Sequence, residues 1–236
     1  VTIIGTNGSG KSTLLNLLAG AITPDAGSVF IKGRDVTRQK DHQRARAIAR
    51  VFQNPFTGTA PDLTIAENLL IASLRGRKHL LRMGLTASRL TSFRKQVAGL
   101  EMQLEDRLDN IIGSLSGGQR QAISLLMAVI RKPDVLLLDE HTAALDPKSA
   151  AQIVHLTKVF VEKENLTTFM VTHSMQQALD LGCRTLMMHK GQIIDDISAK
   201  EKSQITADDL LDKFAQLRKT EKLTNEMIDQ LTRDYR

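Results

Sequence analysis

The feature that most constrains the fold of this chain is a glycine-rich loop between a short apolar strand and a helix. The run Gly-Thr-Asn-Gly-Ser-Gly-Lys-Ser from Gly5 to Ser12 follows the β-branched residues 1–4 and matches the pattern G-x-x-x-x-G-K-[ST]. Glycines allow backbone N–H groups to point inward, and the helix start adds partial positive charge, so this loop predicts a phosphate-binding site. A purely structural glycine turn is the alternative, but a chance match in a chain of this length is on the order of 1%. We expect Lys11 to reach the β- and γ-phosphates and Ser12 to bind Mg²⁺.

A second strand ends in two acidic residues. The apolar run 135–138 is followed by Asp139 and Glu140. In α/β proteins the carboxyl edge of the sheet is where ligands bind, although acids in such places also serve as helix caps or solvated strand ends. Together with the phosphate loop, the pair predicts that Asp139 holds Mg²⁺, through water, and that Glu140 orients or deprotonates the water attacking the γ-phosphorus.

Hydrophobic periodicity predicts an α/β fold with a mainly parallel sheet, an inserted all-helical subdomain and a helical C-terminal tail. The phosphate-loop motif indicates that the core is of the P-loop NTPase type. Predicted strands cover residues 1–4, 28–31, 48–52, 135–139 and 168–172, with a hairpin at 184–188 and 192–197. Predicted helices of the core cover residues 12–18, 120–131 and 149–164. The domain bounds we expect are 1–63 and 114–202 for the core, 64–113 for the helical subdomain and 203–236 for the tail.

Composition excludes several classes of protein. No apolar stretch approaches the roughly 18 residues of a membrane span, so we expect no transmembrane helix. The single cysteine, Cys183, cannot form an internal disulfide, which favours a reduced, cytosolic protein with Cys183 as a small apolar side chain. The net charge of +6 permits anionic partners without selecting among them. Aromatic residues make up only 3% of the chain, which disfavours stacking on single-stranded nucleic acid.

A third motif, Leu-Ser-Gly-Gly-Gln from Leu115 to Gln119, precedes Asp139 by 20 residues. In the plainest interpretation it is a glycine turn in which Ser116 caps the following helix. The order of motifs is more specific: the phosphate loop, LSGGQ, VLLLDE, a Leu-Asp-Pro around Asp146 and an isolated His173. This series resembles the ATP-binding cassette (ABC) family over roughly residues 1–197.

The resemblance implies a dimer in which LSGGQ of one subunit closes on the ATP held by the phosphate loop of the other. Ser116 and Gly118 would then touch the γ-phosphate in trans, and Asp146 would lie at the dimer seam. The nucleotide-binding set is Gly5, Thr6, Asn7, Gly8, Ser9, Gly10, Lys11, Ser12, Thr13, Ser116, Gly117, Gly118, Gln119 and Asp146. The catalytic set is Glu140, His173 as the switch residue and Gln53 as a contact of the attacking water. The Mg²⁺ ligands are Ser12, Gln53 and Asp139.

Some features depart from the family pattern. After the catalytic acid the family usually has proline or another small residue, whereas this chain has His141; we interpret it as a spectator rather than as a group that tunes Glu140. The chain opens inside a strand, so we expect an N-terminal segment to be missing, and with it the aromatic residue on which the family stacks adenine.

Seven basic residues between 75 and 95 are interpreted as a solvated face, with contact to acidic lipid headgroups as the alternative.

The function implied is an ATPase subunit of an ABC transporter, peripheral on the cytoplasmic face of the membrane and bound to separate transmembrane permease subunits. An importer is favoured because exporters of the family often fuse the cassette to their spans. An extracytoplasmic solute-binding protein would then act through the permease. The rival is a non-transport ABC-type ATPase acting on ribosomes or DNA. Such relatives usually carry tandem cassettes or a long coiled coil, for which the 103 positions between Lys11 and Ser114 are too few, so a nucleic-acid partner is not expected.

Overall fold

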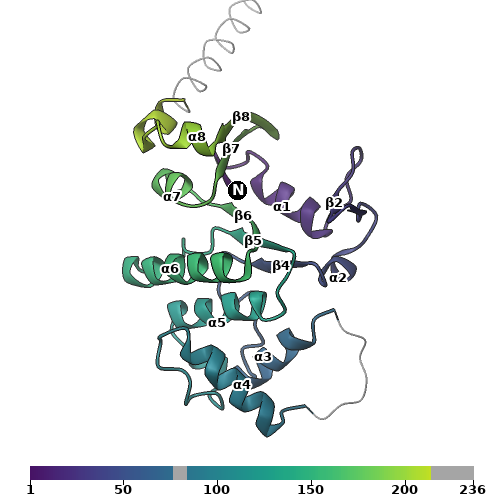
Figure 1. Ribbon diagram of the computed structural model, residues 1–236, viewed down its shortest axis with the longest axis vertical. Helices are drawn as coiled ribbons and strands as arrows, with labels where there is room; N and C mark the ends of the chain where they lie inside the picture. Colours follow the sequence, from purple (N-terminus) through teal and green to yellow (C-terminus); the bar gives the residue numbers. More distant parts are fainter. Residues whose placement is uncertain (77–83, 214–236) are drawn as a thin grey trace, which may run out of the picture.

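The fold is built on a six-stranded sheet, seen in the computed structural model that describes residues 1–76 and 84–213. The strand order is β4-β5-β6-β1-β7-β8 (Figure 1). Its strands are β1 (Thr2–Gly5), β4 (Ile48–Val51), β5 (Val135–Asp139), β6 (Thr167–Val171), β7 (Arg184–His189) and β8 (Gln192–Ser198). All neighbours pair in parallel except β7 and β8, which form an antiparallel hairpin. The expected mainly parallel sheet and its terminal hairpin are therefore confirmed.

Strand register brings the predicted functional segments to one edge of the sheet. Asp139 at the end of β5 is level with Val171 at the end of β6, and Val171 is level with Ile3 of β1. Because parallel strands end at a common edge, the loop after β1 and the residues after β5 and β6 emerge together.

Alternate residues of the strands face opposite layers of helices, as the pleat requires. On one face, Ile3, Leu137 and Val171 pack with Leu15 of α1 (Lys11–Ala19). On the other, Leu136 and Leu138 pack with α5 (Gly117–Val129) and α6 (Pro147–Glu164). The helix after the phosphate loop, α1, therefore covers one face of the sheet, and the helix after LSGGQ, α5, covers the other.

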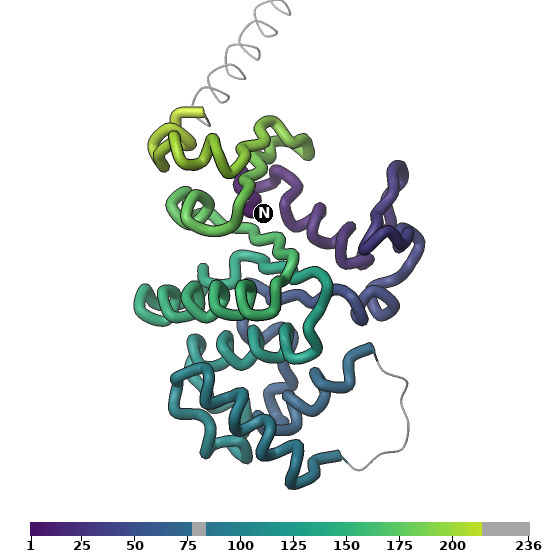
Figure 2. The backbone as a smooth tube through the Cα atoms, viewed as in Figure 1, coloured from purple at the N-terminus to yellow at the C-terminus, as the bar shows by residue number. Residues whose placement is uncertain are grey.

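The remaining elements of the core are short. They are β2 (Phe30–Ile31), β3 (Arg34–Asp35), α2 (Asp41–Arg44), α7 (Met175–Asp180) and α8 (Ala199–Lys202). The tube in Figure 2 shows β2 and β3 as a projecting antiparallel hairpin beside the end of α1. The strand predicted at residues 28–31 is therefore present but only two residues long.

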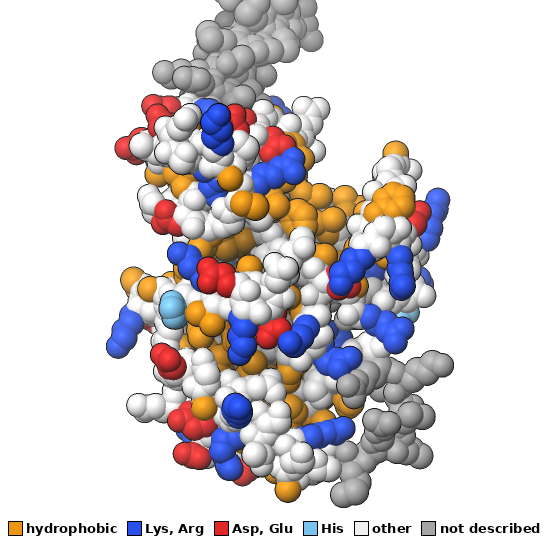
Figure 3. All heavy atoms as spheres, viewed as in Figure 1, with side chains coloured by type: hydrophobic (Ala, Val, Ile, Leu, Met, Phe, Trp, Pro, Cys, Tyr) orange, Lys and Arg blue, Asp and Glu red, His pale blue; other side chains and the backbone are white. Residues whose placement is uncertain are grey.

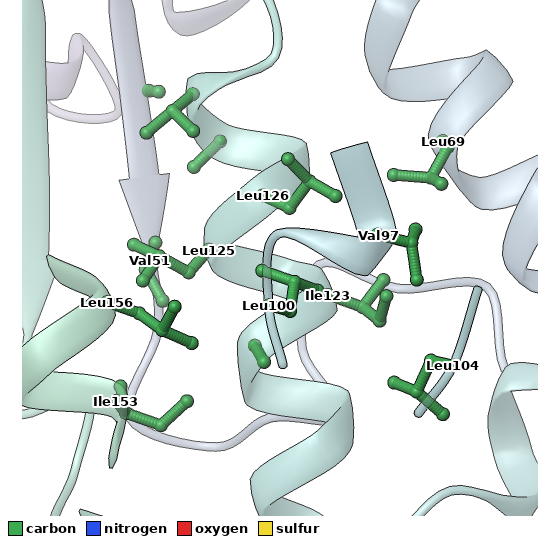
Figure 4. Packing of buried hydrophobic residues seen from close by; sticks show 14 of the residues in the cluster. Val51, Leu69, Val97, Leu100, Leu104, Ile123, Leu125, Leu126, Ile153 and Leu156 are labelled. Atoms are coloured by element: carbon green, nitrogen blue, oxygen red, sulfur yellow. The ribbon is translucent and has the colours of Figure 1, made fainter. Parts of the chain in front are cut away.

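The stretch 64–113 contains α3 (Ile65–Leu74), α4 (Ala87–Ala98) and the 3₁₀ turn η1 (Ile112–Ser114). Thr64 caps α3: its hydroxyl accepts from the N–H of Glu67, while Glu67 accepts from the N–H of Thr64. These helices share one core with the sheet through α5 (Figure 4). The predicted boundary between residues 113 and 114 stays a prediction, because α5 packs against both regions.

The far end of α1 is held by a buried arginine. Arg44 of α2 donates from Nη1 to the carbonyl oxygens of Leu17 and Leu18 at 2.6 and 2.7 Å, and from Nη2 to that of Thr37 at 2.9 Å. The last carbonyls of a helix lack intrahelical partners and favour positive charge nearby. The helix that follows the phosphate loop is thereby fixed at the end remote from the loop.

Cys183 is exposed, in the turn between α7 and β7, and its interpretation as a small apolar side chain stays a prediction. On the face shown in Figure 3, basic and acidic side chains are interspersed rather than gathered into one patch. Within the described ranges, no helix is both long enough and apolar enough to span a membrane.

The tail predicted at 203–236 lies mostly outside the described residues, which include a helical segment at 207–213. Part of the basic stretch, at residues 77–83, also lies outside them.

Candidate functional site

At Gly5, the first position of the loop after β1, the structure leaves no room for a side chain. A Cβ on Gly5 would lie 2.4 Å from the carbonyl oxygen of Met188 and 2.5 Å from Oγ of Ser9. Gly10, which precedes α1, has φ of 95°, in the left-handed region where glycine is favoured. These positions let the chain turn sharply from the strand into the helix, so the N-terminus of α1 faces the loop.

Lys11 lies inside this loop. Its Nζ donates to the carbonyl oxygens of Gly5 at 2.9 Å and Thr6 at 3.0 Å, and the residue is only 6% exposed. Burial lowers the pKa of Lys11, while the charges of Glu140 and Asp139 oppose that decrease. Ser12 and Thr13, by contrast, are exposed at the first turn of α1. The loop therefore presents one ammonium group, held by backbone carbonyls, and two accessible hydroxyls.

Asp139, at the end of β5, makes an ion pair that the sequence did not reveal. Its Oδ2 accepts from Nη2 of Arg50 in β4 at 2.6 Å, and both side chains are mostly buried. Nothing in the sequence marks Arg50 as a partner, because a single arginine in a strand has no periodic or motif signal and lies 89 positions away.

Glu140 and His173 are brought together. Oε1 of Glu140 lies 2.7 Å from Nε2 of His173, and the Glu140 N–H donates to the carbonyl oxygen of Val171. The carboxylate is mostly buried whereas the imidazole is half exposed. Glu140 has φ of 47°, so a non-glycine residue occupies the left-handed region at this place.

Gln53 follows β4 at the same edge of the sheet, and its side chain is exposed. The backbone next to it is held by Gln121 of α5, whose Nε2 donates to the carbonyl oxygens of Phe52 at 3.2 Å and His141 at 2.7 Å. Gln121 thus ties together the residues adjacent to Gln53 and Glu140. The sequence does not predict this link, because a glutamine on a helix carries no signal of its partners.

His141 is fully inside the core. Its Nε2 lies 3.0 Å from Oγ1 of Thr157 in α6, and burial lowers the pKa of His141 to about 4. The side chain is therefore neutral at pH 7 and contacts a helix in the core. Its interpretation as a catalytic spectator stays a prediction.

The LSGGQ residues lie at the start of α5, away from the loop of their own chain. Ser116 caps α5 by accepting from the N–H of Gln119 at 3.3 Å, and both Ser116 and Gly117 are exposed. Gly118 lies against α6: a Cβ there would be 2.6 Å from Oγ of Ser149. Since α1 and α5 cover opposite faces of the sheet (Figure 1), the chain does not bring LSGGQ to the loop at Gly5.

Asp146 is the N-cap of α6, next to LSGGQ. Its Oδ1 accepts from the N–H groups of Lys148 at 3.1 Å and Ser149 at 3.0 Å. Hydrogen bonds from the Ser149 hydroxyl and N–H hold the pKa of Asp146 below its usual range. Its position beside LSGGQ agrees with a shared surface for these residues.

The donor set suits Mg²⁺ bound together with phosphates. Within residues 1–76 and 84–213, no three His, Cys, Asp or Glu side chains cluster to form an all-protein metal cage. Magnesium is typically held by one or two carboxylates plus substrate phosphates, with several waters retained. Ser12 and Asp139 carry hard oxygen atoms at this edge of the sheet, near the Lys11 ammonium, that could act as such ligands.

Comparison with known proteins agrees with this geometry. A family model described as ABC transporter matches residues 1–143. The tyrosine transport ATP-binding protein of Clostridioides difficile (strain R20291) is 42% identical over 214 residues, covering 91% of this chain and 85% of the relative. A probable sulfate/thiosulfate import ATP-binding protein of Chlorella vulgaris is 38% identical over 86% of this chain and 81% of the relative. A dimeric ATP-binding cassette solved in a post-hydrolysis state with ADP and phosphate matches with a TM-score of 0.69 at 28% identity, covering 84% of each chain.

Proposed function

The chain belongs to the ABC transporter family and is an ATP-binding, ATP-hydrolysing subunit, and from this premise we propose that it drives solute import through separate membrane permease subunits. The observation that carries the proposal is the convergence of Lys11, Asp139, Glu140 and His173 at one edge of the sheet. The relative named for tyrosine transport supports a role in transport, and the relative named for sulfate/thiosulfate import supports its direction.

We assign roles to the residues at this edge from their contacts. Lys11 exchanges its carbonyl partners for oxygens of the β- and γ-phosphates, with which charge-assisted hydrogen bonds are stronger. Ser12 and Gln53 would bind Mg²⁺ and Asp139 would hold it through water; when bound, the ion would supply positive charge opposite the phosphates. Glu140 orients and deprotonates the attacking water, and His173, at 2.7 Å from Glu140, moves to contact the γ-phosphate.

The second half of the site is proposed to come from another subunit. Ser116 and Gly117 are exposed and lie on the opposite side of the sheet from α1. A head-to-tail dimer with two-fold symmetry places LSGGQ of each subunit on the nucleotide of its partner. The dimeric relative with ADP and phosphate supports this arrangement.

A groove beside Gln53 is the surface we propose for the permease. It has a volume of about 550 Å³ and lies between the edge strand β4 and the helices α3 and α5. Val51 and Phe52 line it on the strand side, and Ile71, 54% exposed, lines it on the helix side. A helix of a permease subunit is the occupant proposed, because a motion of the Gln53 segment would then reach the membrane protein directly. The chain would thus work on the cytoplasmic face of the membrane, and a solute-binding protein would act through the permease.

Co-purification from membranes tests this surface. The tagged ATPase is purified from solubilised membranes of its source organism, and the amount of permease subunit retained on it is measured. Ile71→Glu is expected to reduce retention at least about tenfold, because the carboxylate would have to lose its bound water when a partner helix covers it. Val159→Glu, at an exposed hydrophobic residue of α6 outside the groove, is the matched control. Equal retention by both variants would refute the groove, and recovery of ribosomes in place of membrane subunits would refute the transport function.

A further inference from the structure

We propose that Arg50 is a positioning residue that sets the separation of the two protein segments carrying the Mg²⁺ ligands. This inference rests on the proposed role of Asp139 and Ser12 at the metal. Arg50 does not touch nucleotide or metal in the proposal; it acts through Asp139 and through α1.

One guanidinium group connects both segments. Nη2 of Arg50 donates to Oδ2 of Asp139 at 2.6 Å, and Nη1 donates to Oδ1 of Asn16 at 2.5 Å. The planar guanidinium has its donors in a fixed fork, so the two acceptors are held at a defined spacing. Arg50 thus joins the end of β5 to α1.

Asn16 lies one helical turn beyond Ser12 on the same face of α1, since residues four apart are neighbours on a helix. Fixing Asn16 therefore fixes Ser12, and Arg44 already holds the other end of this helix. Asp139 is fixed by the other arm of the same side chain. The distance between the Ser12 hydroxyl and the Asp139 carboxylate is consequently set by Arg50.

The guanidinium is itself well fixed. It is only 16% exposed, and its Cζ lies 4.8 Å from the centroid of the Phe52 ring, within the range of a cation–π contact. Phe52 immediately precedes Gln53, the third proposed ligand. Only one carboxylate oxygen of Asp139 is engaged by Arg50, which leaves Oδ1 for a water on the metal.

The test separates metal binding from nucleotide binding. In the Glu140→Gln background, which prevents turnover, the dissociation constant of ATP is measured with Mg²⁺ and with EDTA, and the ratio of the two constants gives the benefit of the metal. Arg50→Met is expected to reduce that ratio roughly 10- to 100-fold, the usual effect of removing a partner of a metal ligand. Its ATP affinity in EDTA is expected to change less than about twofold, because Lys11 and the loop are untouched.

Three variants make the result decisive. Arg184→Met breaks another Arg–Asp pair, with Asp196 on the distant β7–β8 hairpin, and is expected to leave the ratio unchanged. Arg50→Lys keeps the charge but loses the fork, and an intermediate ratio is expected. Asn16→Leu removes only the α1 arm and is expected to reduce the ratio less than Arg50→Met, which keeps the test available if Arg50→Met fails to fold.

The inference is overturned if Arg50→Met and Asn16→Leu both retain the wild-type ratio, or if affinity falls equally with Mg²⁺ and with EDTA. Asp139→Asn distinguishes the causes of failure. If it also leaves the ratio unchanged, the proposed metal role of Asp139 is wrong; if it lowers the ratio while Arg50→Met does not, only the positioning role of Arg50 is wrong.

Discussion

The two halves of the proposed composite site differ in how their polar groups are satisfied. At the sheet edge, Lys11 donates to carbonyl oxygens, Asp139 pairs with Arg50, and Glu140 contacts His173. At the start of α5, Ser116 is exposed and does no more than cap its own helix. The first half carries charged groups that already have partners, and the second carries an open surface of small residues.

This difference indicates what each half needs in order to act. Phosphate binding at the sheet edge exchanges existing hydrogen bonds for stronger ones, so this half can bind nucleotide in a single subunit. The LSGGQ half has only the capping hydrogen bonds of its own helix and gains contacts with nucleotide when a second subunit approaches. A defect at the sheet edge should therefore impair ATP binding, whereas a defect in LSGGQ should impair closure of the dimer.

The largest effect is expected from removing the charge of the proposed catalytic acid. Glu140→Gln should retain ATP binding but reduce hydrolysis by a factor on the order of 10² or more, because the amide cannot accept the proton from the attacking water. Turnover and ATP affinity are measured on the same preparation. Near-normal turnover would remove Glu140 from the mechanism.

The next effect distinguishes the halves directly. Lys11→Ala should weaken ATP binding at least about tenfold, because it removes a charged donor to the phosphates. Ser116→Arg should leave binding by a single subunit intact but prevent closure of the dimer. Both variants should be inactive in hydrolysis, and equilibrium binding together with turnover measures each stage.

Mixing these two variants tests whether the halves meet in trans. A hybrid dimer has both lesions in one composite site and an intact loop facing an intact LSGGQ in the other. Some hydrolysis is expected to return. Hybrid formation and nucleotide occupancy are measured in parallel, and hybrids with ATP bound at the intact site and no activity above either parent would contradict the trans arrangement.

A smaller effect is expected at His141, whose backbone carbonyl oxygen accepts a hydrogen bond from Gln121 of α5. This bond connects the helix that follows LSGGQ to the residue after Glu140. The pKa of His141 in the folded protein is about 4, whereas it is about 6.5 when unfolded. Between these values the unfolded chain binds more protons, so the free energy of unfolding should fall as the pH decreases from about 6.5 to about 4. The loss attributable to this residue is up to about 3 kcal/mol and is absent above pH 7.

Denaturant unfolding at several pH values measures that dependence. His141→Gln keeps a donor near Thr157 without the titrating ring, and its unfolding free energy should decrease less over the same interval. His155→Gln, at an exposed histidine of α6, is the control and should follow the wild type. Identical pH dependence in all three proteins would show that His141 is protonated without cost.

The smallest effect separates neighbouring glycines of LSGGQ. Gly118→Ala places a Cβ 2.8 Å from Cβ of Ser149, so we expect a loss of about 1–2 kcal/mol in unfolding free energy. Gly117→Ala meets only Leu145 at 3.5 Å and should be neutral or slightly stabilising in a helix. Ser149→Gly should recover the loss in Gly118→Ala, and equal stability of the two alanine variants would show that Gly118 is not packed as described.

Much of the fold followed from local pattern. Three features could be predicted from short runs of residues: the loop at Gly5, the strand ending at Asp139 and the terminal hairpin. Within each run, neighbouring residues favour the same local backbone structure. The strand at 28–31 was predicted too long, because a short, mainly apolar run cannot show that only two of its residues pair with another strand. The exposure of Cys183 was not predicted, because it depends on the turn after α7.

The site was less predictable than the fold, because its contacts join distant segments. The order of motifs placed Glu140 and His173 in one catalytic set but did not predict the contact between them. Arg50 and Gln121 could not be found, since each acts on partners tens of residues away and neither belongs to a spacing that sequence alone reveals.

At Glu140, the left-handed backbone conformation makes the residue that favours stability different from the residue that is proposed to be needed for activity. A side chain held there costs about 1 kcal/mol, and glycine would relieve it. Glu140→Gly would therefore ease the backbone while discarding the carboxylate on which hydrolysis is proposed to depend. Directed evolution for heat resistance alone would tend to select glycine at this position, and only a simultaneous demand for ATP turnover would keep the acid in place.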